Sequence, residues 1–159
     1  MKKVVARSLF AIATLGVAAG VSAQLKPEEM IKFRQSGYTF MAWNMGKIKA
    51  MAVDEKVPFD AKQVSAAADV VAAVANSGMG ALYSKETLDG TGWKKTRLKP
   101  EFFDKMDEVK EVAVNFVKQA NELKKVAATG DQAAIKAQFG ETGKACKACH
   151  DKFRMEEDK

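Results

Sequence analysis

Hydrophobic residues recur at intervals of three and four over four stretches of this 159-residue chain. This spacing is typical of one buried face of an α-helix, because an α-helix has 3.6 residues per turn. No stretch shows the alternation of hydrophobic and polar residues that marks a half-buried strand. The pattern therefore predicts four amphipathic helices and no sheet.

The first two predicted helices carry start and stop signals. Pro27-Glu28-Glu29 suits a first helical turn, because proline fits that turn and acidic side chains match the helix dipole there. We expect this helix to end near Ala52. The second helix starts at Asp60, which with Gln63 resembles a capping box, and stops at residues 76 to 78. The apolar stripes are Met30, Phe33, Tyr38, Met41, Met45 and Ile48 in the first helix, and Val64, Ala68, Val71 and Ala75 in the second.

The third helix is expected to begin near Pro100-Glu101, and the fourth at Asp131, directly after the helix-ending Gly130. The third stripe includes Phe103, Met106, Ala113, Ala120, Leu123 and Ala127, with Val109 or Lys110 and Phe116 or Val117. The fourth places Ile135, Phe139, Thr142, Cys146, Cys149, His150 and Phe153 on one broad face. Residues 78 to 99 contain four glycines and no regular period, and the length of this stretch suggests that it wraps something.

Four amphipathic helices joined mostly by short connections predict an all-α fold, a four-helix bundle of up-down-up-down topology. The N-terminus adds a second feature. Basic residues precede an apolar run from Leu9 to about Ala19, and Val21-Ser22-Ala23 is a small-residue cleavage site. Residues 1–23 are therefore predicted to be a cleaved secretory signal peptide, and the run is too short to span a bilayer. Residues 24–159 would form one domain, without a membrane anchor.

Charge adds little to this interpretation. The whole chain has a formal net charge of +6, but three of its 26 basic residues and none of its 20 acidic ones lie in the signal peptide. Residues 24–159 therefore have a net charge of +3. Nucleic-acid binding is not indicated. The basic cluster formed by Lys94, Lys95, Arg97 and Lys99 is either a solvated loop or a site for an acidic partner.

The sequence Cys146-Lys147-Ala148-Cys149-His150 contains both cysteines and the single histidine of the chain. C-x-x-C-H is the attachment signature of c-type haem. Each thiol adds across a vinyl group of the porphyrin, and His150 is the expected axial ligand of the iron. Because bacteria attach this haem outside the cytoplasm, the motif and the signal peptide agree on a periplasmic protein.

Other interpretations of the motif are weaker. A structural zinc site needs four ligands, and the chain has no further Cys or His. A thioredoxin-like redox pair would follow a strand, and none is predicted. A disulfide between Cys146 and Cys149 is possible but leaves His150 unexplained. One covalently attached haem c is therefore the expected cofactor, enclosed by the bundle.

With these residues in view, the chain resembles the cytochrome c′ family, the high-spin branch of class II cytochromes c. The matching stretches are Pro27-Glu28-Glu29, Arg34-Gln35-Ser36-Gly37-Tyr38, Trp43-Asn44-Met45-Gly46-Lys47 and the C-x-x-C-H motif followed by Arg154. The resemblance implies an iron held by His150 alone, with the opposite face open but crowded by apolar groups. It also implies a homodimer built largely from the first two helices.

The resemblance places Tyr38 at the distal side of the haem, four residues after Arg34. Low-spin relatives carry a methionine near this point, so tyrosine favours the open form. Taken without the family, Tyr38 is an ordinary core aromatic. Met41, one turn away, is the alternative sixth ligand, although methionine at helical spacing is usually core filler.

Further site residues follow from the same resemblance. Arg34 and Gln35 approach the propionates, and Thr96 is a weaker candidate for the same region; by itself Arg34 resembles a surface residue. Arg154, one helical turn beyond His150, either covers the proximal face or is solvated. Trp43 suits a dimer contact or the core, and Trp93 suits the haem edge.

These observations predict reversible binding of NO and CO at a hindered distal site, with NO buffering or transfer and one-electron exchange, rather than an enzyme. The alternative is a six-coordinate electron carrier with His150 and a methionine as ligands. A peroxidase lacks support, because no distal histidine is available for acid–base work. The sequence does not identify a redox partner protein.

Overall fold

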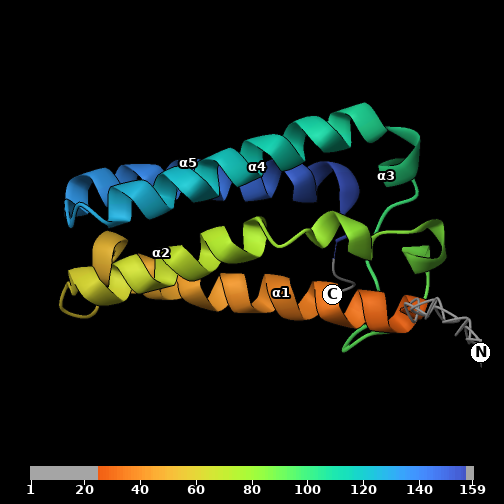
Figure 1. Ribbon diagram of the computed structural model, residues 1–159, viewed down its shortest axis with the longest axis horizontal. Helices are drawn as coiled ribbons and strands as arrows, with labels where there is room; N and C mark the ends of the chain where they lie inside the picture. The colour runs from red at the N-terminus through yellow and green to blue at the C-terminus, as the bar shows by residue number, and fades with distance from the viewer. Residues whose placement is uncertain (1–24, 157–159) are drawn as a thin grey trace, which may run out of the picture.

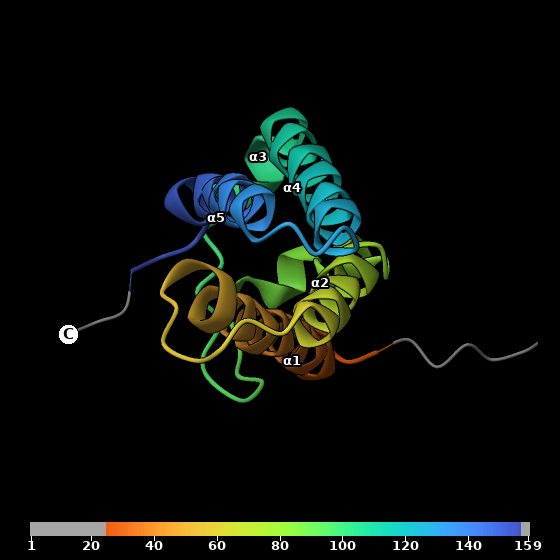
Figure 2. The same ribbon diagram turned by 90° about the vertical axis from the view of Figure 1, so that its left-hand side faces the viewer.

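The computed structural model describes residues 25–156 and contains four long helices (Figures 1 and 2). These are α1 (Pro27–Ile48), α2 (Ala61–Ala75), α4 (Met106–Ala127) and α5 (Gln132–Phe153). Each long helix runs opposite to the one before it, which confirms the predicted up-down-up-down bundle. Within the described residues no strand is formed, only two isolated bridges. The predicted signal peptide, residues 1–23, lies outside the described residues.

Local sequence sets most helix ends. Asp60 accepts hydrogen bonds from the backbone N–H groups of Lys62 at 2.9 Å and Gln63 at 3.1 Å, so it caps α2 as predicted. Asp131 caps α5 in the same way, accepting the Ala134 N–H at 3.0 Å. These bonds satisfy donors that have no partner inside the helix. None of the helices in residues 25–156 combines the length and hydropathy of a membrane span.

Two predicted helices begin and end close to the expected residues but are not regular α-helices throughout. The first continues beyond Ile48 as a π-helical turn, η1 (Lys49–Val53), close to its predicted end. The third is not continuous from Pro100: α3 (Glu101–Asp104) is separated from α4 by Lys105, whose φ of −120° and ψ of 46° interrupt the helix. The break lets Phe102 of α3 pack edge-on against Phe153 of α5, with ring centroids 5.8 Å apart.

The largest buried cluster lies among all four long helices. It consists of Ile48, Ala52, Val64, Ala67, Ala68, Leu123, Ala127 and Ile135. The predicted stripe of α1 is partly wrong: Met41 and Ile48 are buried, but the Phe33 side chain is 52% exposed. Ile31, Arg34 and Asn44 occupy inner positions instead. Arg34 and Asn44 each lie three positions after a buried apolar residue, Ile31 and Met41, so polar side chains share the buried face of α1, which a search for apolar residues overlooks.

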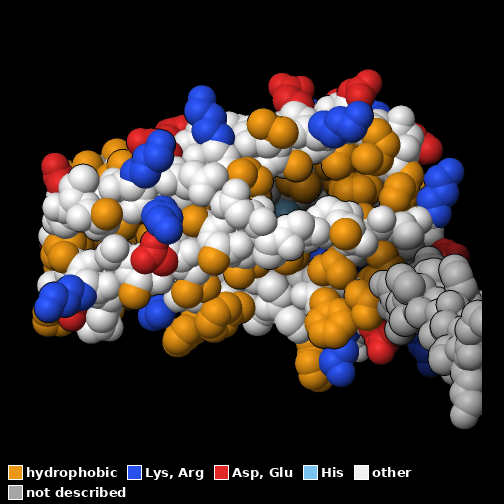
Figure 3. Space-filling view, in the orientation of Figure 1, with side chains coloured by type: hydrophobic (Ala, Val, Ile, Leu, Met, Phe, Trp, Pro, Cys, Tyr) orange, Lys and Arg blue, Asp and Glu red, His pale blue; other side chains and the backbone are white. Residues whose placement is uncertain are grey.

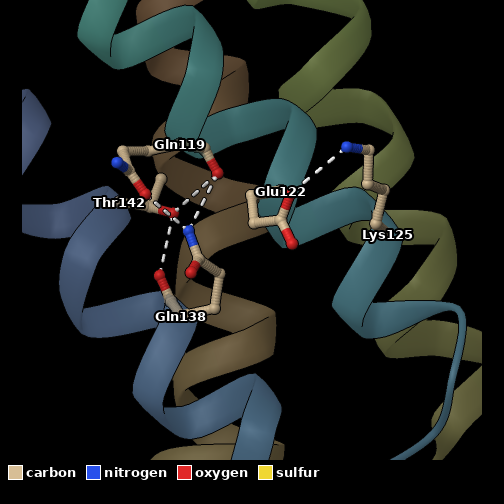
Figure 4. Close-up of polar contacts among 5 residues, drawn as sticks. All are labelled: Gln119, Glu122, Lys125, Gln138 and Thr142. Atoms are coloured by element: carbon tan, nitrogen blue, oxygen red, sulfur yellow. Dashed lines mark hydrogen bonds and ion pairs between the residues drawn. The ribbon is translucent and has the colours of Figure 1, made fainter.

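Polar contacts also join α4 and α5 (Figure 4). The Thr142 hydroxyl, fully buried, lies 2.9 Å from the Gln138 carbonyl oxygen and 3.3 Å from that of Gln119. The Gln138 side-chain amide donates to Oε1 of Gln119 at 2.8 Å. Because Thr142 lies one turn before Cys146, these contacts fix which face of α5 turns toward the rest of the bundle.

Near the C-terminal end of α5, the loop between α2 and α3 meets the first half of α1 (Figure 1). This loop contains two 3₁₀ turns, η2 (Met79–Leu82) and η3 (Lys85–Leu88). Gly78 begins it with a φ of 79°, a conformation that favours glycine. The fold therefore brings the C-x-x-C-H end of α5, the start of α1 and the irregular loop to one end of the bundle.

Candidate functional site

The motif residues occupy the last two turns of α5. Cys146, Cys149 and His150 are separated by three and four residues, so they share one face of the helix, and all three are partly buried. Both thiols are free, and burial raises the pKa of each. No three His, Cys, Asp or Glu side chains within residues 25–156 converge on a point that could hold a bare metal ion, so the zinc interpretation gains no support.

An apolar wall stands beside Cys149. Its buried members are Leu98, Phe102, Val109 and Phe153, and Tyr83, Leu88, Phe103 and Val112 pack against them. These residues come from the loop, α3, α4 and α5. Figure 3 shows a hollow in the molecular surface between α4 and the segment that follows α2, with hydrophobic side chains around it. The surroundings of the thiols therefore suit a large, mostly apolar group.

Tyr38 faces this region from α1. Its hydroxyl lies 2.9 Å from the hydroxyl of Tyr83, and its side chain is 39% exposed. Desolvation raises the pKa of both phenols, and the charges of Cys149 and Cys146 act on Tyr38 in the same direction. Through Tyr83, Tyr38 therefore adjoins the apolar cluster that packs against Cys149.

Arg34 lies one turn before Tyr38 and is only 6% exposed, so its interpretation as a surface residue is wrong. Its Nη1 donates to the Leu82 carbonyl oxygen at 3.1 Å and to Oγ1 of Thr87 at 3.2 Å. Its Nη2 donates to Oγ1 of Thr96 at 3.0 Å, which brings these two predicted site residues together. Burial lowers the pKa of Arg34. Sequence reasoning missed Thr87, whose only signal was its place in the irregular loop.

Gln35 binds the tip of the same loop. Its Oε1 accepts the backbone N–H groups of Trp93 at 2.8 Å and Lys94 at 3.1 Å, and its Nε2 donates to the Lys94 carbonyl oxygen at 2.8 Å. Gly92 permits this approach: a Cβ atom there would lie 2.6 Å from the backbone nitrogen of Lys32. The loop therefore wraps α1, and the Trp93 side chain is 65% exposed.

Arg154 lies just past the end of α5 rather than on it. Its φ of −118° and ψ of 128° are extended, and its N–H donates to the His150 carbonyl oxygen at 3.0 Å. The side chain is exposed, and its positive charge helps to lower the pKa of His150, although desolvation is the larger cause. A lowered pKa keeps the imidazole neutral, which is the form that binds iron.

Met41 and Trp43 pack with residues other than those of the motif. Met41 is 6% exposed and packs with Val71 and Ala120, in a cluster of α1, α2 and α4 that does not include Cys149. Trp43 is 58% exposed and stacks on Phe40 with ring centroids 5.7 Å apart. Trp43 is therefore not a core residue, and Met41 belongs to the packing of the bundle.

The residues fit haem c as a group. Two free thiols one helical turn apart match two vinyl attachment points, and a neighbouring imidazole is a side chain that can bind haem iron. The apolar wall beside Cys149 suits the flat porphyrin. Arg34 has five N–H donors and uses three of them in the hydrogen bonds above, so two remain for an acidic edge.

Comparison with known proteins gives a consistent result. Residues 29–154 match the family model described as Cytochrome C′. The chain is 52% identical to cytochrome c′ of Allochromatium vinosum over 155 residues, which are 97% of this chain and 99% of that protein. It is 51% identical to cytochrome c′ of Rhodocyclus tenuis over 132 residues, 83% of this chain and 98% of the relative.

Solved structures agree with the sequence matches. A cytochrome c′ described as having ligand-controlled dimer dissociation superposes with a TM-score of 0.79 at 54% identity, over 84% of this chain and all of that one. A ferrous variant of cytochrome c′ from Alcaligenes xylosoxidans with bound NO superposes with a TM-score of 0.74 at 29% identity, over 84% of this chain and 99% of that one.

Proposed function

Because the chain belongs to the cytochrome c′ family, we propose that it is a periplasmic protein that binds NO and CO at a hindered, open position of a five-coordinate haem iron. Covalently attached haem c is the cofactor of this family and of this chain. When bound, the haem supplies an iron atom that takes up small gases and changes its charge by one electron. NO buffering or transfer is the proposed role, without turnover of a substrate.

Three residues of α5 carry the attachment in this proposal. Cys146 and Cys149 form the two thioethers, and each S–H adds across one vinyl double bond, so the proton and the sulfur both end on the former vinyl group. His150 would bind the haem iron. The support is that these are the only Cys and His side chains of the chain and that they share one helix face.

Tyr38 is the proposed distal residue, and one observation carries this assignment. Its hydroxyl lies 2.9 Å from that of Tyr83, whose ring packs in the apolar cluster that also includes Cys149, whereas Met41 packs in a different cluster with Val71 and Ala120. A tyrosine ring over the iron would be apolar and bulky without acting as a ligand, so it would hinder polar ligands and yield to a small uncharged gas that pushes it aside. This arrangement favours gas binding over a fixed methionine ligand.

The remaining site residues act around the haem edge and the proximal face. We propose that Arg34 and Gln35 neighbour the propionates, with Thr96 supporting Arg34 through its 3.0 Å hydrogen bond. The charge-assisted donors of Arg34 suit a carboxylate. Arg154 influences the proximal side through its charge, which acts on His150.

Export and dimerisation complete the proposal. The predicted signal peptide, residues 1–23, supports a periplasmic location, where thioether attachment takes place. A homodimer is supported by the exposed, stacked Phe40 and Trp43 on α1 and by the dimer described for the solved relative. Sedimentation velocity with and without CO tests it: one monomeric species under both conditions would contradict a dimer.

The test of the proposed function is the visible spectrum of the dithionite-reduced holoprotein before and after addition of CO. A broad single band that sharpens with CO is expected for an open iron. Tyr38→Ala should retain the broad band and bind CO faster, and the matched control Met41→Leu should behave as the wild type. Sharp, split bands that CO leaves unchanged would contradict the proposal, and their loss in Met41→Leu would identify a His/Met electron carrier.

A further inference from the structure

We propose that Tyr83 is a positioning residue for Tyr38: its hydroxyl holds the Tyr38 phenol in the position from which Tyr38 hinders gas binding. The inference rests on the proposed function, because it assumes that Tyr38 guards the iron. The observation that carries it is the 2.9 Å distance between the two hydroxyl oxygens, which joins α1 to the irregular loop.

Tyr83 is well fixed itself. Its ring stacks on Phe102 with centroids 4.6 Å apart and planes at 13°, and the Arg34 guanidinium carbon lies 4.4 Å from the ring centroid. The preceding residue is also anchored, because the Leu82 carbonyl oxygen accepts a hydrogen bond from Arg34. Phe102 is 7% exposed and packs edge-on against Phe153 of α5. The loop thus presents Tyr83 as a rigid hydrogen-bonding partner.

Tyr38 is less fixed. Its side chain is 39% exposed, and the bond to Tyr83 is its one side-chain hydrogen bond within the described part of the chain. A ring held at its hydroxyl end by a single bond has two populations, one bonded and one displaced. The bond between the hydroxyls stabilises the bonded position, so it sets how often Tyr38 moves aside.

The size of the effect follows from the strength of one neutral hydrogen bond. Such a bond changes an equilibrium by roughly two- to tenfold. A gas that binds only when Tyr38 is displaced has its association rate scaled by the displaced fraction. Its dissociation rate is not scaled, because the bond is already broken while the gas is bound. Removing the Tyr83 hydroxyl should therefore raise association and leave dissociation unchanged.

The experiment compares CO association and dissociation rates of the reduced wild-type holoprotein with those of Tyr83→Phe, which retains the ring and its stacking on Phe102. We expect association to be about two- to tenfold faster and dissociation to be unchanged. Ser36→Ala is the matched control. It removes another 2.8 Å bond between α1 and the loop, from Nε1 of Trp93 to Oγ of Ser36, without touching Tyr38, and it should alter neither rate.

Two further measurements make the test specific. In a Tyr38→Phe variant the hydrogen bond between residues 38 and 83 is already lost. Adding Tyr83→Phe should therefore have no further effect on CO association. The chain has two tyrosines, so Tyr83→Phe leaves Tyr38 as the single source of tyrosine bands in the ultraviolet resonance Raman spectrum. Those bands should report loss of the hydrogen bond between the phenols, independently of any gas.

The outcomes distinguish the positioning role of Tyr83 from the distal role of Tyr38. If Tyr38→Ala speeds CO association but Tyr83→Phe does not, the positioning role is wrong and the distal role of Tyr38 stands. The positioning role would also be wrong if Tyr83→Phe accelerated CO association as much in the Tyr38→Phe background as in the wild type. If neither Tyr38→Ala nor Tyr83→Phe alters association, the proposed distal function fails together with this inference.

Discussion

Replacing Arg34 by methionine should destabilise the protein strongly, although this residue looks ordinary in the sequence. The change retains a long apolar stem and removes three charged hydrogen-bond donations, to the Leu82 carbonyl oxygen and to the hydroxyls of Thr87 and Thr96. Methionine also loses the contact of the guanidinium with the Tyr83 ring. Arg34→Met therefore removes the buried set of hydrogen bonds that hold the irregular loop to α1 and leaves the exposed ones.

The magnitude follows from what each acceptor retains. Thr87 and Thr96 still accept backbone N–H groups, from Ser84 at 3.3 Å and Leu98 at 3.4 Å, whereas the Leu82 carbonyl loses its Arg34 donor. An acceptor left unpaired costs about 1–3 kcal/mol, and a cation–π contact contributes about 0.5–2 kcal/mol. Methionine regains part of this loss, because burying a guanidinium is itself costly. We expect a net loss of about 2–4 kcal/mol.

The assay is urea unfolding of the holoprotein, followed by far-ultraviolet circular dichroism, with the covalent haem present in both states. Arg34→Lys should be intermediate, because lysine retains the charge but lacks the planar fork that reaches several acceptors. Gln35→Ala is the matched control, since it removes three exposed hydrogen bonds to the same loop and should cost less. A loss below about 0.5 kcal/mol for Arg34→Met, or a larger loss for Gln35→Ala, would refute the reasoning.

Three further changes test the bundle itself. Leu123→Ala, at a fully buried position, should lower the free energy of unfolding by about 2–5 kcal/mol. Val114→Ala, at a position that is 69% exposed, should change it by less than about 0.5 kcal/mol. Equal losses for the two variants in urea unfolding would contradict the assigned core. Thr142→Val should cost about 1 kcal/mol in the same assay, and a neutral result would remove the role given to its buried hydroxyl. Hydrogen bonds lower the pKa of Asp60 in the folded protein, so its stabilising effect is complete above the unfolded pKa of about 4 and is lost as pH falls through the folded pKa. Asp60→Ala should therefore lower the midpoint temperature of thermal unfolding at pH 7, and this midpoint should differ less from that of the wild type below about pH 4. A difference in midpoint that stays constant with pH would be evidence against the cap.

The helices and their ends were predictable because their causes are local. Asp60 and Asp131 each bond N–H groups two or three residues away, so the cap and its target appear in the same short stretch of sequence. Gly130, with a φ of 72°, lies two residues beyond the Ala128 cap of α4, one position later than the C′ site predicted for it. The break at Lys105 was not predictable in this way, because it accompanies the packing of Phe102 on Tyr83 and Phe153, which are far from it along the chain.

The buried polar site was predictable only in part. The family resemblance brought Arg34 and Thr96 into one region, and their hydrogen bond agrees with that. No local signal connected Arg34 with Leu82 and Thr87, which are 48 and 53 residues away in a segment without periodicity. Charged residues are rarely buried unless they are paired, so a helix position that holds arginine is normally assigned to the surface. Only the folded loop supplies the acceptors.

The choice between Tyr38 and Met41 shows why the loop matters for function. The two residues are three positions apart on α1, so helical spacing gives both the same general direction and cannot separate a gas-binding protein from an electron carrier. What separates them is their partners: Met41 packs against α2 and α4, and Tyr38 bonds Tyr83 of the irregular loop. On the proposed assignment, the ligand chemistry of the iron therefore depends on a loop that supplies neither the thioethers nor the axial histidine. Changes confined to residues 78 to 99 should accordingly tune gas binding while α1 and α5 remain the same.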